Sequence, residues 1–184
     1  VGTVKIIQAT DGRSAEYTLP ITECEIKSSW KHLTDTCKLT FGKNIYYTDK
    51  NGTKVSWLDK PVVNSNDLPP LLLRGDKIKV ELGYRYIKDA KTGEVLLSNS
   101  VFEGFVSKII PGLPIRIEAE DWMWKLKQIK TPKKTFKSAE VSAMIAELTV
   151  GTGITVETGN ITTKIGDYKT GGETIAEVLK DLQG

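Results

Sequence analysis

The sequence holds little of the chemistry that most active sites need. Its 184 residues include one histidine, His32, and two cysteines, Cys24 and Cys37. One imidazole is too few for a histidine-based metal cluster. A catalytic pair of His32 with a cysteine, or with Ser28 or Ser29, has only sequence proximity to support it. Two cysteines cannot make a disulfide framework, so we expect free thiols in a reducing compartment, with a single bridge as the alternative. We therefore predict that the protein is not an enzyme and uses no metal or cofactor.

Long apolar runs and a strong net charge are also missing. No stretch reaches the roughly 18 apolar residues of a membrane-spanning helix, so we expect no membrane partner. The N-terminus lacks the basic-then-apolar pattern of a signal peptide. The formal net charge of +3 is too small to argue for a nucleic-acid partner. The lysines between Lys125 and Lys137 lack the row of aromatic residues that a stacking platform needs, which favours a solvated linker over sequence-specific nucleic-acid binding.

What the sequence does contain is two-residue alternation. In Leu73–Tyr84, one face carries Ile78, Val80, Leu82 and Tyr84, and the other carries lysines and a glutamate. This period indicates a half-buried strand. Further strands are predicted at Thr3–Ala9, Ala15–Leu19, Ile21–Lys27, Asp35–Phe41, Asn44–Thr48, Thr53–Leu58, Val101–Ile109 and Ile115–Glu120, with a hairpin turn near Asp89–Gly93. The predicted fold class is mainly β: a small antiparallel β-barrel followed by the beginning of an α/β domain.

The pattern changes after Glu120. Asp121 is expected to N-cap a short helical turn that places Trp122 and Leu126 four residues apart. We expect Trp122 and Trp124 to plug one end of the barrel, the alternative being a platform on which a sugar stacks.

Beyond Lys137 the apolar period becomes helical. Ser138 is a candidate N-cap, Val141–Leu148 carries one apolar face, and Gly151 suits the C-terminal cap. Short strands are expected at Ile154–Glu157 and Ile161–Ile165, followed by a second helix with Ile175, Val178, Leu179 and Leu182 on one face. Because Pro132 breaks any helix in the lysine-rich segment, we place the domain boundary there. Residues 1–130 form the barrel, and residues 131–184 form a helix–strand–helix unit, the start of a truncated α/β domain.

Two short motifs suggest chemistry but favour structural interpretations. Glu118 and Glu120 share one strand face about 7 Å apart, within the range of an inverting glycosidase. Arg116 on the same face would keep both carboxylates ionised, which favours a charged outer surface. Arg74-Gly75-Asp76 spells an integrin-binding tripeptide, but it leads directly into a strand, where glycine and aspartate commonly form a turn.

The order of the β segments resembles the first barrel domain of phage tail hub proteins. Gly75–Tyr84 (GDKIKVELGY), the strand that contains Gly104-Phe105-Val106, and Ile115–Lys127 (IRIEAEDWMWKLK) follow one another as in the late control D family and the baseplate hubs of contractile tails. The spike proteins of type VI secretion are more distant relatives. The resemblance covers residues 35–182. The residues that carry it are Gly75, Asp76, Gly83, Tyr84, Gly104, Glu120, Asp121, Trp122, Trp124 and Leu126.

This resemblance implies a structural component of a phage or prophage tail, the baseplate hub. Such hubs form trimers whose two barrels per chain give a pseudo-sixfold ring that joins the tail tube to the spike. The implied partners are further copies of the chain, as a homotrimer of the full-length protein, together with tail tube and spike proteins. The implied location is the virion tail, after assembly in the bacterial cytoplasm. The second barrel of the family is not within these residues. The residues alone also allow a carbohydrate-binding or adhesion β-sandwich, whose ligand surface uses tyrosines together with Trp57, Trp122 and Trp124.

Overall fold

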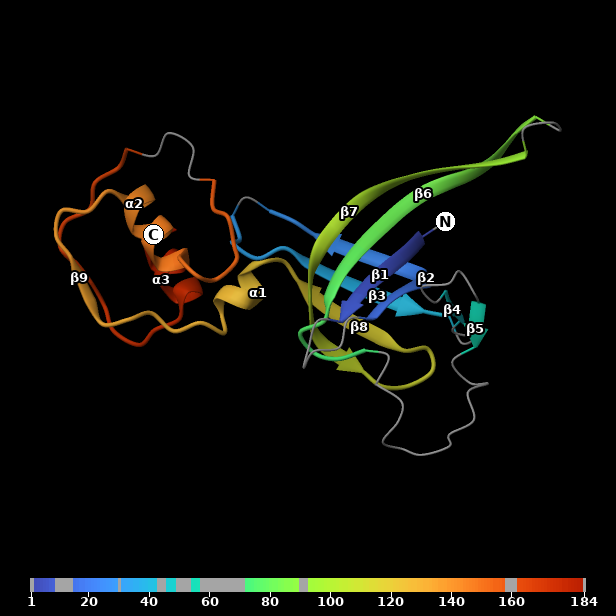
Figure 1. Ribbon diagram of the computed structural model, residues 1–184, viewed down its shortest axis with the longest axis horizontal. Helices are drawn as coiled ribbons and strands as arrows, with labels where there is room; N and C mark the ends of the chain where they lie inside the picture. The colour runs from blue at the N-terminus through green and yellow to red at the C-terminus, as the bar shows by residue number, and fades with distance from the viewer. Residues whose placement is uncertain are drawn as a thin grey trace. The chain divides into compact units, whose positions relative to one another are not determined.

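The computed structural model of the protein describes residues 2–8, 15–29, 31–42, 46–48, 54–56, 72–89, 93–157 and 162–183 (Figure 1). Among the described residues, strands far outnumber helices, so the predicted mainly β class is confirmed. Two compact units are present, Val1–Asp121 and Trp122–Gly184. The division falls earlier than the predicted boundary at residue 130, because Leu126 is buried in the core of the second unit.

The first unit is a closed six-stranded antiparallel β-barrel, which confirms the predicted small antiparallel barrel. Neither the number of strands in the wall nor its closure was predicted. Around the wall the strands follow the order β1, β6, β7, β8, β3, β2, and β1 closes the barrel by pairing with β2. Their bounds are Gly2–Gln8 for β1, Ala15–Lys27 for β2, Thr36–Phe41 for β3, Lys77–Asp89 for β6, Gly93–Ile110 for β7 and Arg116–Glu120 for β8.

Two short strands lie beside the barrel. They are β4, Tyr46–Thr48, and β5, Lys54–Ser56, which pair with each other. Thr48 of β4 also pairs with Thr18 of β2. The structure joins the two strands predicted at Ala15–Leu19 and Ile21–Lys27 into the single strand β2. An irregularity between Ile21 and Glu23 takes the place of the predicted break.

The barrel is filled by the alternate residues that the sequence pattern marks as apolar. Ile78 and Val80 are completely buried, whereas Lys77 and Lys79, which alternate with them, are half-buried on the outer face. The same alternation on the other strands completes one core, made of Val4, Ile6, Leu19, Cys37, Leu39, Phe41, Ile78, Val80, Phe102, Val106, Ile117 and Ala119. Burying each of the larger aliphatic or aromatic side chains stabilises the fold by roughly 1.5–3 kcal/mol.

One hairpin of the barrel is much longer than its neighbours. Strand β6 has 13 residues and β7 has 18, and they pair as far as Asp89 opposite Gly93, so the predicted pairing of these two strands as a hairpin is confirmed. Strand β1 accompanies β6 only as far as Leu82, which lies opposite Gly2. Figure 1 shows the two strands running past the end of β1. We call the described residues beyond this point, 83–89 and 93–98, the arm.

The second unit combines a small sheet with helices. Strands β9, Lys134–Phe136, and β10, Tyr168–Thr170, form an antiparallel pair. Helices α1, α2 and α3 span Met123–Leu126, Val141–Thr149 and Ile175–Gln183, so the two longer helices are confirmed. Their core consists of Leu126, Phe136, Met144, Leu148, Ile175, Ala176 and Val178.

The ends of these helices differ in part from the predictions. Ser138 does not cap α2, because its backbone has a φ of +44° and Glu140 is the N-cap. Gly151 follows the C-cap with a φ of +77°, which confirms the expected helix end. Residues 154–157 form no strand. Ile161 lies outside the described residues, and Lys164 makes only an isolated bridge to Glu140.

Candidate functional site: the barrel mouth and the arm

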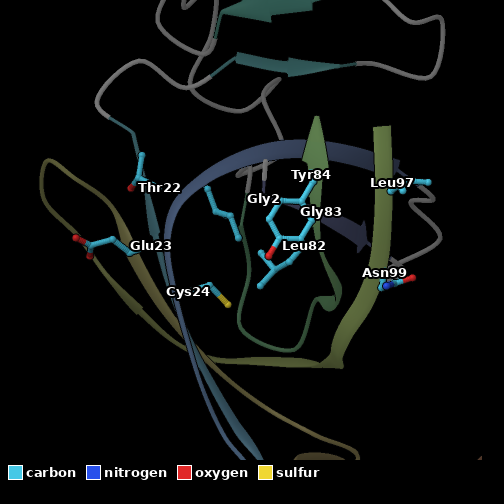
Figure 2. Close-up of a pocket in the computed structure, with 10 residues that line it drawn as sticks. Gly2, Thr22, Glu23, Cys24, Leu82, Gly83, Tyr84, Leu97 and Asn99 are labelled. Carbon is cyan, nitrogen blue, oxygen red and sulfur yellow. The ribbon is translucent and has the colours of Figure 1, made fainter. Parts of the chain in front are cut away.

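A cleft opens where β1 begins and the arm leaves the barrel wall. On one side, β1 pairs with β2 from Thr3 opposite Pro20; on the other, it pairs with β6 from Gly2 opposite Leu82. Beyond these pairs the two strands that flank β1 have no strand between them among the described residues. A cleft of about 470 Å³ lies there, lined by Gly2, Ile21, Thr22, Glu23, Cys24, Leu82, Gly83, Tyr84, Leu97 and Asn99 (Figure 2).

The walls of this cleft expose large apolar side chains. Leu82 is 37% exposed, Leu97 is 58% exposed and Tyr84 is 82% exposed. The sequence pattern placed Leu82 and Tyr84 on the same buried face as Ile78 and Val80, and the structure corrects this for the outer two residues. Among the described residues, β1 reaches Leu82 with Gly2, and Tyr84 lies further along β6. Figure 2 shows Tyr84 and Leu82 together on one wall, with Cys24 on the opposite wall.

Two glycines of the predicted signature are required by close backbone packing. A Cβ atom on Gly83 would lie 2.1 Å from the carbonyl oxygen of Leu97, on the paired strand of the arm. A Cβ atom on Gly104 would lie 2.2 Å from the carbonyl oxygen of Glu120 on β8. Both clashes are with backbone, which cannot rotate away as a side chain can. Gly83 therefore sets the geometry at the base of the arm, and Gly104 sets the approach of β7 to β8.

Gly75 and Asp76 form the turn that leads into β6. Gly75 has a φ of +94°, a conformation that favours glycine. Its N–H donates to the carbonyl of Val106, and the N–H of Val106 donates to the carbonyl of Asp76. The Asp76 side chain is 1% exposed, and its Oδ2 accepts a 2.7 Å hydrogen bond from the N–H of Leu73. Because this carboxylate is buried, Arg74-Gly75-Asp76 cannot present it to an integrin.

Asp121 ties two strand ends together and does not cap a helix. Its Oδ2 accepts a 3.1 Å hydrogen bond from the N–H of Asp35, and its own N–H donates to the carbonyl of Asp35. The N-cap of α1 is Trp122, which makes no side-chain capping bond. The predicted cap at Asp121 is therefore wrong, because its carboxylate serves the start of β3.

Glu118 and Glu120 lie on the barrel wall among cross-strand partners. Glu118 is opposite Lys38 of β3 on one side and Lys108 of β7 on the other. Glu120 is half-buried and lies opposite Thr36 and Phe105. Both cross-strand partners of Glu118 are therefore lysines, and neither is the second carboxylate that glycoside hydrolysis uses. This arrangement is typical of a charged outer face.

The tryptophans of the signature belong to the second unit. Trp122 and Trp124 are half-buried, and Leu126 is buried in the core of that unit. The ammonium group of Lys125 lies 5.9 Å from the centre of a Trp122 ring, within the range of a cation–π contact. That the tryptophans plug the end of the barrel stays a prediction, as does a sugar-stacking role. Trp57, the third aromatic residue of the carbohydrate hypothesis, lies outside the described residues.

Groups able to act in catalysis are sparse and scattered. His32 is exposed, and its backbone N–H donates a hydrogen bond to the carbonyl of Ser29. Cys24 and Cys37 are free thiols, and burial raises the pKa of both, so they are poor nucleophiles at neutral pH. Within the described ranges, no three His, Cys, Asp or Glu side chains are grouped to hold a metal ion. None of the helices in this part of the chain is long and apolar enough to cross a membrane.

Sequence reasoning found part of the cleft and missed the rest. Gly83 and Tyr84 stood in the predicted signature, but Gly2, Leu97 and Asn99 did not. The signal that could have found them is a difference in length. The apolar alternation predicted for Leu73–Tyr84 spans more residues than the strand predicted at Thr3–Ala9. Comparison with known proteins finds neither a family model nor a curated protein that matches the chain.

Proposed function

We propose that the protein is a structural component of a phage or prophage tail, a baseplate hub that acts by self-association. The observation that carries the proposal is the exposed apolar face at the barrel mouth, where Leu82, Tyr84 and Leu97 continue the core pattern onto the arm. Large exposed apolar side chains that lie together mark interaction surfaces on soluble proteins. A hub needs such surfaces, because its work is to hold neighbouring subunits in a ring.

The arm is suited to contact a neighbouring subunit. A two-stranded ribbon is at best marginally stable in water by itself, and this arm extends from a rigid barrel. A strand edge without a neighbouring strand can also pair with a strand of another chain. In the proposed trimer, the arm and cleft of one copy contact the barrel of the next, and the charged outer faces of strands such as β6 remain available to solvent.

The remaining architecture agrees with what the resemblance implies. A closed barrel followed by a small unit of two main helices and a two-stranded sheet occurs in the expected order along the chain. A barrel suits a ring component, because its strands pair among themselves and leave few open edges. The proposed partners are further copies of the chain and the tail tube and spike proteins. The proposed location is the virion tail, after assembly in the bacterial cytoplasm.

The test is the absolute mass in solution, measured by light scattering for this chain and for its full-length parent. We expect a trimeric parent that dissociates when Leu97→Asp or Tyr84→Asp places a charge at the cleft. Leu113→Asp is the matched control, because Leu113 is 74% exposed in the same unit but does not line the cleft. A parent that stays monomeric at high concentration would overturn the proposal. A monomeric parent that binds glycans and loses them with Trp122→Ala would identify a carbohydrate-binding module instead.

A further inference from the structure

Cys24 and Cys37 lie on neighbouring strands with their sulfur atoms in contact. The Sγ–Sγ distance is 4.0 Å, and neither residue is in a disulfide. Strands β2 and β3 pair Cys24 with Leu39 and Ile26 with Cys37, so the cysteines are diagonal neighbours across the two strands. Diagonal neighbours on one face of a sheet are close enough for side-chain contact. A disulfide needs its sulfur atoms about 2.05 Å apart, so closing the bond requires an approach of about 2 Å.

The two thiols differ in their access to solvent. Cys37 is 0% exposed inside the barrel, whereas Cys24 is half-buried and lines the cleft. Figure 2 shows the Cys24 side chain at the wall of this cleft. Cys24 also lines a second hollow of about 300 Å³, formed by residues of β2, β3, β7 and β8. A small reagent therefore reaches Cys24 first, and Cys37 lies behind it.

We propose that Cys24 and Cys37 form an oxidation site, at which a peroxide oxidises Cys24 and Cys37 then closes an intramolecular disulfide. The order of the steps follows from access, since Cys24 is the thiol that a peroxide can reach. Cys37 lies in contact with Cys24, which is where a resolving thiol must be. This site does not depend on the proposed function in a phage tail.

The two steps balance as follows. The Cys24 sulfur attacks one oxygen of hydrogen peroxide, an S–O bond forms, the O–O bond breaks, and the hydroxide released leaves as water with the Cys24 proton. The Cys37 sulfur then attacks the Cys24 sulfur, the S–S bond forms, the S–O bond breaks, and a second water leaves with the Cys37 proton. Two electrons pass from the sulfur atoms to the peroxide, and the net products are one disulfide and two waters.

The surroundings of the pair indicate a slow reaction. Burial raises the pKa of the Cys24 thiol, and burial together with the neighbouring Cys24 sulfur raises the pKa of Cys37. Only the thiolate reacts quickly with peroxide, so the protein is expected to purify reduced and to need excess peroxide. The bridge would join β2 to β3 in the barrel wall and draw the Cys24 sulfur away from the cleft towards Cys37.

The experiment treats the folded chain with hydrogen peroxide, removes the peroxide, and then alkylates it in denaturant before mass spectrometry. We expect an intact mass lower by about 2 Da, no alkylation at either cysteine, and a linked pair of tryptic peptides, residues 14–27 with residues 32–38. The species should run as a monomer without reductant, and dithiothreitol should restore two alkylated cysteines. As a control, the chain is treated with peroxide in denaturant, where the fold no longer holds the two cysteines together. Oxygen adducts and disulfides between chains should then increase.

Two variants identify the roles of the cysteines. Cys24→Ala should leave Cys37 unoxidised in the folded protein, because the buried thiol is then the only one present. Cys37→Ala should stop the reaction at Cys24, with a gain of about 16 or 32 Da. If Cys37→Ala does not fold, the Cys24→Ala variant and the peptide map of the unsubstituted protein still test the proposal. Unchanged mass, stable oxygen adducts on Cys24 in the unsubstituted protein, or a bridge only between chains would each overturn the proposal.

Discussion

Gly104→Ala should strongly destabilise the barrel, although it adds a single methyl group. The new Cβ atom would lie 2.2 Å from the carbonyl oxygen and 2.8 Å from the carbonyl carbon of Glu120. It would also lie 2.9 Å from Cε1 of Phe102, on the same strand. The Glu120 atoms belong to the backbone of β8, so the clash is relieved only if β7 and β8 separate.

The magnitude follows from what that separation disturbs. Forcing an extra carbon into a packed interior costs typically about 1–3 kcal/mol. Separation would also weaken the pairing of Phe105 with Glu120 and of Val106 with Ala119, and each hydrogen bond lost there costs about 1 kcal/mol. The free energy of unfolding of the barrel should therefore fall by roughly 2–5 kcal/mol, a large part of the roughly 5–15 kcal/mol of a typical domain.

The assay should report on the barrel alone. Cys37 is completely buried in the first unit, so the urea concentration at which its thiol becomes reactive measures unfolding of that unit. Gly42→Ala is the matched control, because its Cβ atom would meet only the Thr22 methyl group at 3.6 Å, an ordinary contact. We expect Gly42→Ala to stay within about 1 kcal/mol of the natural protein. Equal midpoints for Gly104→Ala and Gly42→Ala would refute the reasoning.

Three further changes test other local structures. Thr174 and Glu177 cap α3 reciprocally: the Glu177 N–H donates to Oγ1 of Thr174, and Oε2 of Glu177 accepts from the Thr174 N–H. Thr174→Ala removes the first of these bonds, so it should destabilise the second unit by about 1 kcal/mol in thermal melting. The backbone and side-chain hydrogen bonds from Thr174 lower the pKa of Glu177. The stability that the ionised Glu177 contributes is therefore present above its unfolded-state pKa and is lost as pH falls through the lower folded-state pKa. Glu177→Gln should reduce the difference in melting temperature between neutral and acid pH. Asp76→Asn should cost about 1–3 kcal/mol in barrel unfolding, because the amide places an NH2 donor where one oxygen of the buried carboxyl group lies beside the Leu73 N–H. An unchanged urea midpoint would show that the turn does not need the carboxyl group.

The sequence was a good guide to structure that depends on neighbouring residues. Alternation predicted the barrel strands, and the helical period at Ile175–Leu182 predicted α3. The sequence Thr174-Ile175-Ala176-Glu177 also has the spacing of a capping box, so the start of α3 was readable and was missed. At α2 the choice of Ser138 failed because the chain takes a positive φ there and the helix begins later.

Features that depend on distant residues could not be read in this way. Whether Leu82 and Tyr84 are covered depends on which residues of β1 lie opposite β6, and this register joins segments about 75 residues apart in the chain. The role of Asp121 depends on Asp35, 86 residues earlier. The three-residue strands β9 and β10 are too short to show a period, and their pairing is likewise non-local. The contact of Cys24 with Cys37 needs the register of β2 against β3, which the local pattern does not specify.

Closure of the barrel by β1 has a consequence for how the chain folds. The hairpins β2–β3 and β6–β7 join nearby residues, whereas β1 must also pair Gly2–Ile7 with Lys77–Leu82, which are synthesised much later. On the ribosome, one edge of β1 can pair early with β2, and the other edge stays open until β6 emerges. Contacts of such long range slow folding. While it waits, this open edge is exposed to wrong strand pairing, and so is the edge of β3 that pairs later with β8.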